Sequence, residues 1–360
     1  MMLAPSEQTG RQIALRGRGP LREIILNRPE ALNALTLEMI AAIDTTLSAY
    51  AKDADVHYVL VRGAGPRGLC AGGDIRRIYE SLENGDDWPQ KFWSSEYALN
   101  AYIANYPKPY VAIMDGIVMG GGIGISAHGR HRIVTERTKA AAPEVQIGLI
   151  PDVGATWLLS RAPGESGTCL ALSGMTFSAG DAIFSRLADF YVPSARLDDM
   201  VSAIAGLDAG NQDQLMECIK SYSSVPPPSV LEPKRALIDE CFRHDTVEQI
   251  LASLDGAQTE FTTELAGLLR RNSPASLKVT LRLLRLARQS TTLEDCLRRE
   301  YSAVLHAAAC AGDLKEGIRA AIIDKDRSPR WVPSKLEDVP EAAVEAYVTF
   351  QPPRPIAFHS

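Results

Sequence analysis

Short apolar runs alternate with longer amphipathic segments through the first half of the chain. Tyr58–Arg62, Tyr110–Met114 and Arg132–Thr135 have the length and composition of buried strands. At the start, Gln12–Leu15 and Leu21–Leu26 flank a Gly-Arg-Gly-Pro turn. Two strand-like runs separated by such a turn are typical of an antiparallel pair. The pattern therefore predicts a sheet built from strands that are mostly separated by helices.

The amphipathic segments between these runs predict helices. Thr36 is placed as the N-cap of a helix that runs to about Lys52, because the apolar positions inside it follow helical spacing. Helical patterns follow at Ile75–Leu82 and Pro89–Asn105, and a short small-residue helix is expected at Ile123–His128. Strands alternating with helices indicate the α/β class.

From Leu197 onward the pattern is almost entirely helical. Ser223–Pro233, which contains three consecutive prolines, is the clearest loop or linker. We therefore predict two regions, an α/β core over 1–196 and a helical C-terminal region over 197–360. The helices expected in the second region are Asp198–Leu207, Asn211–Tyr222, Thr246–Leu254, Phe261–Arg270, Ser276–Ser290 and Leu293–Ala311.

Composition narrows the classes of partner and location. The 360 residues carry a net charge of −6 without a basic patch, which argues against nucleic acid as a partner. Six cysteines are scattered without CxxC spacing, so we expect reduced thiols and no metal site. The N-terminal segment has no apolar core of a signal peptide, and no later run is long enough to span a membrane. A cytoplasmic protein is the simplest interpretation.

A run of three glycines is the first candidate for chemistry. Gly120, Gly121 and Gly122 follow the strand at Tyr110–Met114 and precede a helix. Glycines there let a ligand approach the backbone, and the N–H groups at the helix start carry partial positive charge. No Gly-Lys-Ser/Thr follows, which excludes a P-loop, and Ile125 occupies the sixth position of a dinucleotide fingerprint. An oxyanion site and simple close packing of helix on strand remain.

A second glycine pair favours the oxyanion site. Gly72 and Gly73 follow the strand at Tyr58–Arg62 and also precede a helix-like segment. Two such units would each direct one backbone N–H at a shared point. Stabilising an enolate or a tetrahedral oxyanion requires this arrangement of donors.

At these residues the chain resembles the crotonase (enoyl-CoA hydratase/isomerase) superfamily. The resemblance rests on AGGD at Ala71–Asp74, MGGGIG at Met119–Gly124, PEVQIGLIPDVG at Pro143–Gly154 and LNRPEALNAL at Leu26–Leu35. It implies a stacked ββα spiral in which the thioester carbonyl of an acyl-CoA lies between two backbone N–H groups. Carried onto this chain, the donors would be Gly73 and Gly121.

The acidic positions distinguish groups within the superfamily. Hydratases carry a glutamate where this chain has Gly124, and they share the glutamate at Glu144. Asp152 replaces a family glycine. This pattern resembles the 3-hydroxyisobutyryl-CoA hydrolase group, which hydrolyses the thioester in valine breakdown. The same group carries the glutamate matched by Glu96, and its C-terminal signature matches Gly312–Pro333.

The resemblance implies roles for individual residues. Gly73 and Gly121 would polarise the carbonyl, and Glu144 would act as general base or as nucleophile, two routes that the sequence leaves open. Asp152 would orient Glu144, water or the substrate hydroxyl. The residues expected to bind substrate are Glu96, Gly72, Asp74, Ile75, Arg76, Gly120 and Gly122. CoA is part of the substrate, so no separate cofactor is expected, and the family implies a homo-oligomer, a trimer or hexamer.

Each assignment has a structural alternative. Glu144 and Asp152 both follow a proline and would also suit helix N-termini, and Asp74 suits an N-cap better than a chemical role. His128 and His131 lack the spacing of metal ligands and are interpreted as structural. The functional alternatives are an enoyl-CoA hydratase or isomerase with Glu144 as its only base, and a non-catalytic acyl-CoA-binding homologue.

Overall fold

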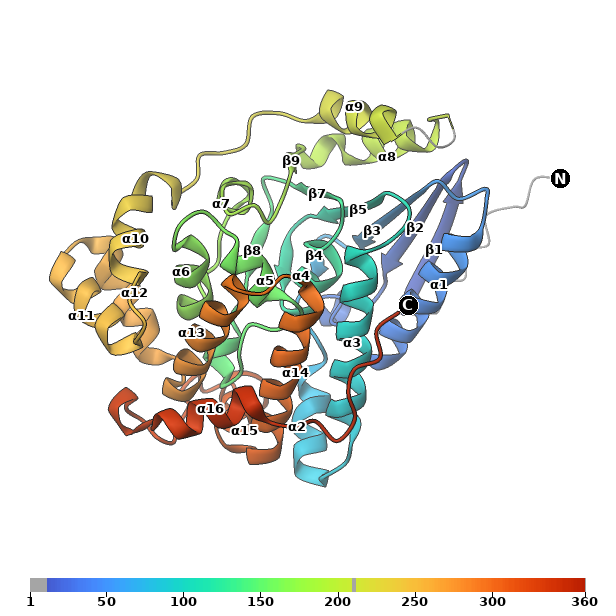
Figure 1. The fold of residues 1–360 in the computed structure, drawn as a ribbon. Helices are drawn as coiled ribbons and strands as arrows, with labels where there is room; N and C mark the ends of the chain where they lie inside the picture. Colours follow the sequence, from blue (N-terminus) through green and yellow to red (C-terminus); the bar gives the residue numbers. More distant parts are fainter. Residues whose placement is uncertain (1–11, 209–211, 360) are drawn as a thin grey trace.

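The computed structural model describes residues 12–208 and 212–359, and its centre is a six-stranded sheet (Figure 1). The order is β1-β2-β3-β5-β7-β9. The first two strands are antiparallel, as predicted, and every later neighbour is parallel. The strands are β1 (Ile13–Arg18), β2 (Leu21–Leu26), β3 (Tyr58–Gly63), β5 (Tyr110–Met114), β7 (His131–Val134) and β9 (Phe190–Tyr191).

A second parallel sheet of three short strands lies beside the first. It consists of β4 (Gly68–Cys70), β6 (Ile117–Met119) and β8 (Lys139–Ala141). Each of these strands follows a strand of the large sheet after a turn, so the chain winds through both sheets as a spiral. The strands were not predicted, because three residues are too few to show a periodicity.

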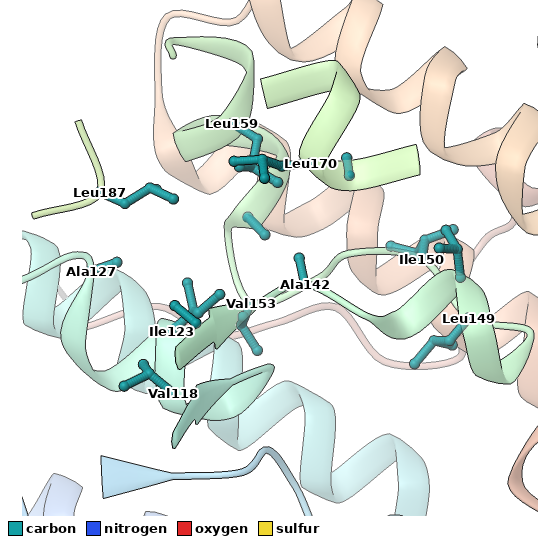
Figure 2. Packing of buried hydrophobic residues seen from close by; sticks show 14 of the residues in the cluster. Val118, Ile123, Ala127, Ala142, Leu149, Ile150, Val153, Leu159, Leu170 and Leu187 are labelled. Atoms are coloured by element: carbon teal, nitrogen blue, oxygen red, sulfur yellow. The ribbon is translucent and has the colours of Figure 1, made fainter. Parts of the chain in front are cut away.

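Side chains along the strands of the large sheet alternate between its two faces, and each face packs into a separate core. In β3, Tyr58 and Leu60 pack under α8 (Leu197–Ala205) and α9 (Gln212–Tyr222), while Val59 and Val61 point into the larger core. Successive side chains of a strand face opposite sides of its sheet, so a continuous apolar run is what a strand covered on both faces needs. Figure 2 shows part of the larger core, which includes Val118, Ile123 and Val153.

Helices of the first half complete the spiral. Thr36 caps α1 through a hydrogen bond from the Met39 N–H, as predicted. Asp74 caps α2 through the Arg77 N–H, which confirms its capping role. The helices are α1 (Leu37–Lys52), α2 (Ile75–Asn84), α3 (Trp88–Ala104), α4 (Gly121–Ser126), α5 (Ala155–Ser160), α6 (Ser166–Ser173) and α7 (Ala179–Phe184).

The C-terminal helices gather at the end of the molecule opposite β1 and β2 (Figure 1). Among them, α13 packs on α5 and α14 packs on α3, so this region completes the core of the spiral. The helices are α10 (Arg235–Phe242), α11 (Val247–Ala257), α12 (Glu260–Arg271), α13 (Pro274–Arg288), α14 (Leu293–Cys310), α15 (Gly312–Ile318), a π-helical turn (Arg319–Ile323) and α16 (Glu341–Thr349). The division of the chain at residue 196 stays a prediction.

Two boundaries near the glycine run differ from those predicted, and the capping alternative for Asp152 is wrong. The helix expected at Ile123–His128 is α4, which begins at Gly121, so two of the three glycines are helical. The strand expected at Arg132–Thr135 is β7, one residue earlier. Helix α5 begins at Ala155 behind Gly154, so Asp152 does not cap it with its side chain.

Candidate active site

A cavity of ≈ 180 Å³ lies between the two glycine segments, α3 and the segment that follows β8. Its lining combines apolar side chains with glycines and three acidic side chains. The lining residues are Ala71, Gly72, Gly73, Ile75, Ile78, Phe92, Trp93, Glu96, Met119, Gly120, Gly121, Pro143, Glu144, Gln146, Ile147, Leu149, Asp152 and Val153. Every residue predicted to be catalytic is therefore at the same cavity.

The two glycine segments touch each other in this cavity. Leu35 pairs with the first segment through two backbone hydrogen bonds, from its N–H to the Gly72 carbonyl and from the Asp74 N–H to its own carbonyl. A Cβ placed on Gly121 would lie 3.5 Å from the Gly72 carbonyl carbon, the atom bonded to the Gly73 nitrogen. Residues 73 and 121 are thus brought together from loops that follow different strands.

The N–H groups of Gly73 and Gly121 are without a hydrogen-bond partner among the described residues. Gly121 is the first residue of α4, where backbone N–H groups have no partner inside the helix. The preceding Gly120 has φ 48° and ψ −119°, a conformation that only glycine adopts without strain. The glycine run therefore both shapes the turn and leaves a donor free.

Glu144 begins the 3-10 turn η2 (Glu144–Ile147), and its side chain is 7 % exposed. The Oε2 atom is buried without a hydrogen-bond partner among the described residues. The Oε1 atom would lie 3.2 Å from a Cβ on Gly120. The turn thus directs the carboxyl group at the second glycine segment instead of into solvent.

Two further carboxyl groups share the cavity. Asp152 accepts a hydrogen bond from the Tyr97 hydroxyl at 2.6 Å, and both side chains are buried. Glu96 comes from α3, one residue before Tyr97, and its Oε1 has no hydrogen-bond partner among the described residues. A Cβ on Gly121 would lie 2.5 Å from this atom, so Glu96 directly adjoins the second glycine segment.

Burial shifts the ionisation of all three carboxyl groups. The pKa of Asp152 rises to about 6 through burial, although the Tyr97 hydrogen bond opposes the rise. Burial, followed by the neighbouring Asp152 carboxyl, raises the pKa of Glu144 well above its ordinary value. Burial and the other two carboxyls do the same for Glu96. Because no Lys or Arg among the described residues lines the cavity, the cluster retains protons at a pH where isolated carboxyls are ionised.

A comparison with known proteins identifies the family. The profile of the enoyl-CoA hydratase/isomerase family matches residues 21–348. The chain belongs to this family. It is 37% identical over 341 residues to the mitochondrial 3-hydroxyisobutyryl-CoA hydrolase of Rattus norvegicus, covering 93% of this chain and 88% of the rat protein. It is also 37% identical to 3-hydroxyisobutyryl-CoA hydrolase 1 of Arabidopsis thaliana, covering 93% and 91% of the two chains.

Solved structures of the enoyl-CoA hydratase/isomerase family match the fold. A carnitinyl-CoA dehydratase from Mycobacterium thermoresistibile is 44% identical with a TM-score of 0.91, covering 97% of this chain and 99% of that one. An enoyl-CoA hydratase from Rhodobacter sphaeroides is 39% identical with a TM-score of 0.89, covering 97% and 100%. The predicted α/β spiral with a helical C-terminal region is therefore confirmed.

Not all predicted substrate-binding residues reach the cavity. Gly122 is buried in α4, where a Cβ would collide with the Cys70 carbonyl, so it allows close packing of helix on strand. Asp74 lies near Arg28 at 3.5 Å besides capping α2. Arg76 is exposed on α2. For these three residues, substrate binding stays a prediction, whereas Gly72, Ile75, Gly120 and Glu96 line the cavity.

The remaining side chains near the site have structural surroundings. The His128 Nε2–H donates to the Val153 carbonyl at 2.8 Å, and burial lowers the pKa of His128 to about 4, so the ring is neutral. Burial raises the pKa of the Cys70 thiol to about 12. Within the described residues, no group of three His, Cys, Asp or Glu side chains is arranged to hold a metal ion. No described helix is long and apolar enough to cross a membrane.

Sequence reasoning missed two residues that support the site. Tyr97 lies inside the segment that singled out Glu96, but no role was assigned to it. Glu300 of α14 is fully buried and reaches the loop that carries Asp152. A signal for Glu300 is present in the sequence, because it continues the apolar stripe of α14 one turn after Cys296 and one turn before Val304. A carboxyl group on a buried helix face needs partners.

Proposed function

We propose that this protein hydrolyses an acyl-CoA thioester, with 3-hydroxyisobutyryl-CoA as the substrate that its curated relatives favour. The observation that carries the proposal is the position of Glu144, a buried carboxyl group with a free oxygen beside two glycine segments whose N–H groups are unpaired. A carboxyl group beside such donors suits attack on a carbonyl carbon. The missing carboxyl at Gly124 disfavours the addition of water to a double bond.

Polarisation of the carbonyl is the first requirement of the reaction. The Gly73 and Gly121 N–H groups would donate to the thioester oxygen and stabilise the negative charge that develops on it. Removing one donor of this kind typically costs about 3 kcal/mol of transition-state stabilisation. Both donors belong to the backbone, so their placement depends on the conformation of the glycine segments.

Glu144 would supply the second requirement, a nucleophile. Acting as base, it takes a proton from water while the water oxygen bonds to the carbonyl carbon, and collapse of the intermediate breaks the carbon–sulfur bond. Acting as nucleophile, its carboxylate displaces the CoA thiolate and water then hydrolyses the resulting anhydride. In both routes one proton of the water that is consumed ends on the thiolate of CoA. Asp152, held by Tyr97, would orient water or the substrate hydroxyl.

The size and chemistry of the cavity support a short, hydroxylated acyl group. A volume of ≈ 180 Å³ suits a four-carbon acyl group, with the rest of CoA outside. Glu96 has a buried oxygen without a partner among the described residues, and this oxygen would accept a hydrogen bond from the substrate hydroxyl. Substrates without that hydroxyl would leave this buried group unpaired, which discriminates strongly, whereas one methyl group changes binding by only about 1–3 kcal/mol.

Release of free thiol from a panel of acyl-CoA substrates tests this proposal. We expect thiol release from 3-hydroxyisobutyryl-CoA, slower release from the straight-chain 3-hydroxypropionyl thioester, and little from isobutyryl-CoA, which lacks the hydroxyl. A single turnover in heavy-oxygen water separates the two routes, since label in the Glu144 carboxyl group marks the anhydride. Absence of thiol release from all substrates refutes the hydrolase.

A hydratase or dehydratase is the second candidate, because the two solved structures described above, 44% and 39% identical to this chain, carry such titles. Under this alternative, Glu144 would serve as the only base. The enoyl thioester absorbs light in the ultraviolet, so loss of this absorbance without free thiol supports the alternative. Thiol release without loss of an enoyl band supports the hydrolase.

The setting of the reaction is part of the same proposal. Hydrolysis of 3-hydroxyisobutyryl-CoA would place the protein in valine breakdown. The rat relative is named as mitochondrial, and the cytoplasmic location predicted for this chain is testable by cell fractionation. The expected trimer or hexamer is testable by analytical ultracentrifugation.

A further inference from the structure

The loop that carries Asp152 contains a strained residue. Val153 has φ 55°, in the left-handed region that β-branched residues avoid, and its side chain is 1 % exposed. Gly154, with φ 80°, follows it. Two successive left-handed residues reverse the chain just before α5 and direct Asp152 back toward the cavity. Such a conformation persists only where the surroundings hold it.

Glu300 holds this turn from the C-terminal side. Its Oε2 accepts the Gly154 N–H at 2.7 Å, and its Oε1 accepts the Thr156 N–H at 3.0 Å and the Thr156 hydroxyl at 2.5 Å. Both carboxyl oxygens are thereby used, and the side chain is fully buried. The three donors belong to Gly154 and Thr156, one and three residues after Val153.

His128 holds the turn from the opposite side. Its Nε2–H donates to the Val153 carbonyl at 2.8 Å, so the carbonyl and the N–H of the Val153–Gly154 peptide group are both hydrogen-bonded, one to His128 and the other to Glu300. A Cβ on Gly154 would lie 2.6 Å from the His128 ring and 2.9 Å from Leu293 of α14. The turn is therefore packed against both His128 and α14.

We infer that Glu300 is a positioning residue for the hydrolysis: by accepting the Gly154 and Thr156 donors, it keeps Val153 left-handed and Asp152 directed at Tyr97 and Glu144. This inference rests on the proposed function for its kinetic tests, while its structural test does not. Glu300 does not line the cavity. Its effect on the reaction is transmitted through the turn.

Glu300→Gln is the most direct variant. A glutamine places its NH₂ group against either the Gly154 or the Thr156 N–H, so one buried backbone donor loses its acceptor. We expect kcat to fall by roughly 10- to 100-fold with KM changed less than about threefold, because small displacements of a reacting group have effects of this size. Glu165→Gln is the matched control, since Glu165 is a buried carboxyl paired with Arg285 and Arg288 outside the cavity.

The pH profile gives a readout that loss of packing alone would not move. The groups that face the Glu300 carboxyl are Asp152 and Glu144 from the cavity side, Tyr97 from α3, and Cys296 on α14 itself. The Glu300 charge raises the pKa of Glu144. Burial raises the pKa of Glu300 itself to about 8, so its charge acts on Glu144 only near and above that pH. Glu300→Gln should therefore remove a change in kcat/KM near pH 8, whereas Glu165→Gln leaves the profile in place. A folded Glu300→Gln protein with wild-type kcat and pH profile would overturn the inference.

Thr156 provides a second test if Glu300→Gln does not fold. Thr156→Val removes the hydroxyl donor and keeps the backbone N–H and the side-chain shape, whereas Thr156→Ser keeps the hydroxyl. We expect kcat to fall about three- to tenfold in the valine variant and to stay at the wild-type level in the serine variant. Equal kcat in both variants contradicts the inference.

A crystal structure of Glu300→Gln tests the positioning role of Glu300 without an activity measurement. Thr156→Val replaces it where the first variant is unstable. We expect Val153 to leave φ near 55° and the Tyr97–Asp152 hydrogen bond to lengthen. An unchanged turn refutes the positioning role even if the protein is an active hydrolase. Conversely, a displaced turn in the variant, together with no thiol release by the wild-type protein, supports the positioning role of Glu300 and refutes the proposed function.

Discussion

The Tyr97 hydroxyl donates a 2.6 Å hydrogen bond to Asp152 Oδ2, and both side chains are buried. This contact joins α3 to the loop before α5, across 55 residues of sequence. It stabilises the ionised form of Asp152 and so limits the rise in pKa that burial causes. The pKa of Asp152 in the cavity thus depends on Tyr97, a residue that carries no charge itself.

Tyr97→Phe tests that dependence. Without the hydroxyl, the pKa of Asp152 rises above about 6, so the acidic limb of kcat/KM moves to higher pH. We expect a larger loss of activity at pH 6 than at pH 8, measured as thiol release. Tyr102→Phe is the control on the same helix, since Tyr102 stacks on His359 away from the cavity. An equal loss at both pH values would show that Asp152 ionisation does not matter.

Glu144→Gln tests the central residue. The variant keeps the shape of the side chain but can neither accept a proton nor attack the carbonyl, so we expect kcat to fall by about 10²- to 10⁴-fold. KM should change little. Thiol release at saturating substrate is the measurement, with the exposed Glu217→Gln as control. A variant that retains more than about a tenth of wild-type kcat would exclude Glu144 as base or nucleophile.

Stability should depend on pH through the buried carboxyls. The folded-state pKa of Asp152, about 6, lies above its unfolded value of 3.8, so the native state binds more protons between these values. The contribution of Asp152 to the free energy of unfolding therefore falls as pH rises from about 4 to about 6 and is then level. Glu96 and Glu144 act in the same direction.

Asp152→Asn should reduce the decrease in the free energy of unfolding with rising pH. Because each pKa unit corresponds to about 1.4 kcal/mol, we expect the variant to be more stable than the wild type at pH 8 by up to about 3 kcal/mol. At pH 4.5 the difference should be smaller, while activity is reduced throughout. Urea unfolding at the two pH values provides the measurement. A stability difference independent of pH would contradict a buried, titrating Asp152.

Gly124→Glu tests whether the missing hydratase carboxyl can be restored. A Cβ at this position would lie 2.7 Å from Asn100 Nδ2 and 2.8 Å from Val153 Cβ, both buried. We therefore expect loss of stability and no gain of hydration of enoyl-CoA. Gly124→Ala isolates the steric part and should cost about 1–3 kcal/mol, as overpacking does.

Gly256→Ala is the control for this substitution. Gly256 lies within α11, and nothing is within 4 Å of its Cβ position, so alanine should be neutral or slightly stabilising there. Thermal unfolding of the two alanine variants gives the comparison. A stable Gly124→Glu protein that hydrates enoyl-CoA would show that the site readily accepts the second carboxyl.

Much of the site could be predicted from local pattern. The strand–glycine–helix units at Gly73 and Gly121 have a strong signature, because consecutive glycines between a strand and a helix indicate a close approach to the backbone. Their convergence also follows from topology, since both units leave parallel strands at the same edge. The acidic residues Glu96, Glu144 and Asp152 were found through the motifs that contain them.

What could not be predicted depends on tertiary contacts. Val153 has a side chain that favours extended backbone, so no propensity indicates its left-handed conformation. The partner of Asp152 is a tyrosine on another helix, and hydrogen bonds between distant segments leave no periodic trace. Helix α4 begins two residues earlier than expected because Gly121 and Gly122 are helical here, packed against Cys70 and Leu35, despite the low helix propensity of glycine.

The contact of Glu300 with Gly154 spans 146 residues, and this has a consequence for biosynthesis. A ribosome adds Gly73, Gly121, Glu144 and Asp152 well before α14, so the emerging polypeptide holds every proposed reacting group while the Val153 turn still lacks its acceptor. Competence to react with a thioester therefore arrives late in translation. A partly synthesised chain is therefore expected to consume acyl-CoA more slowly than the complete one.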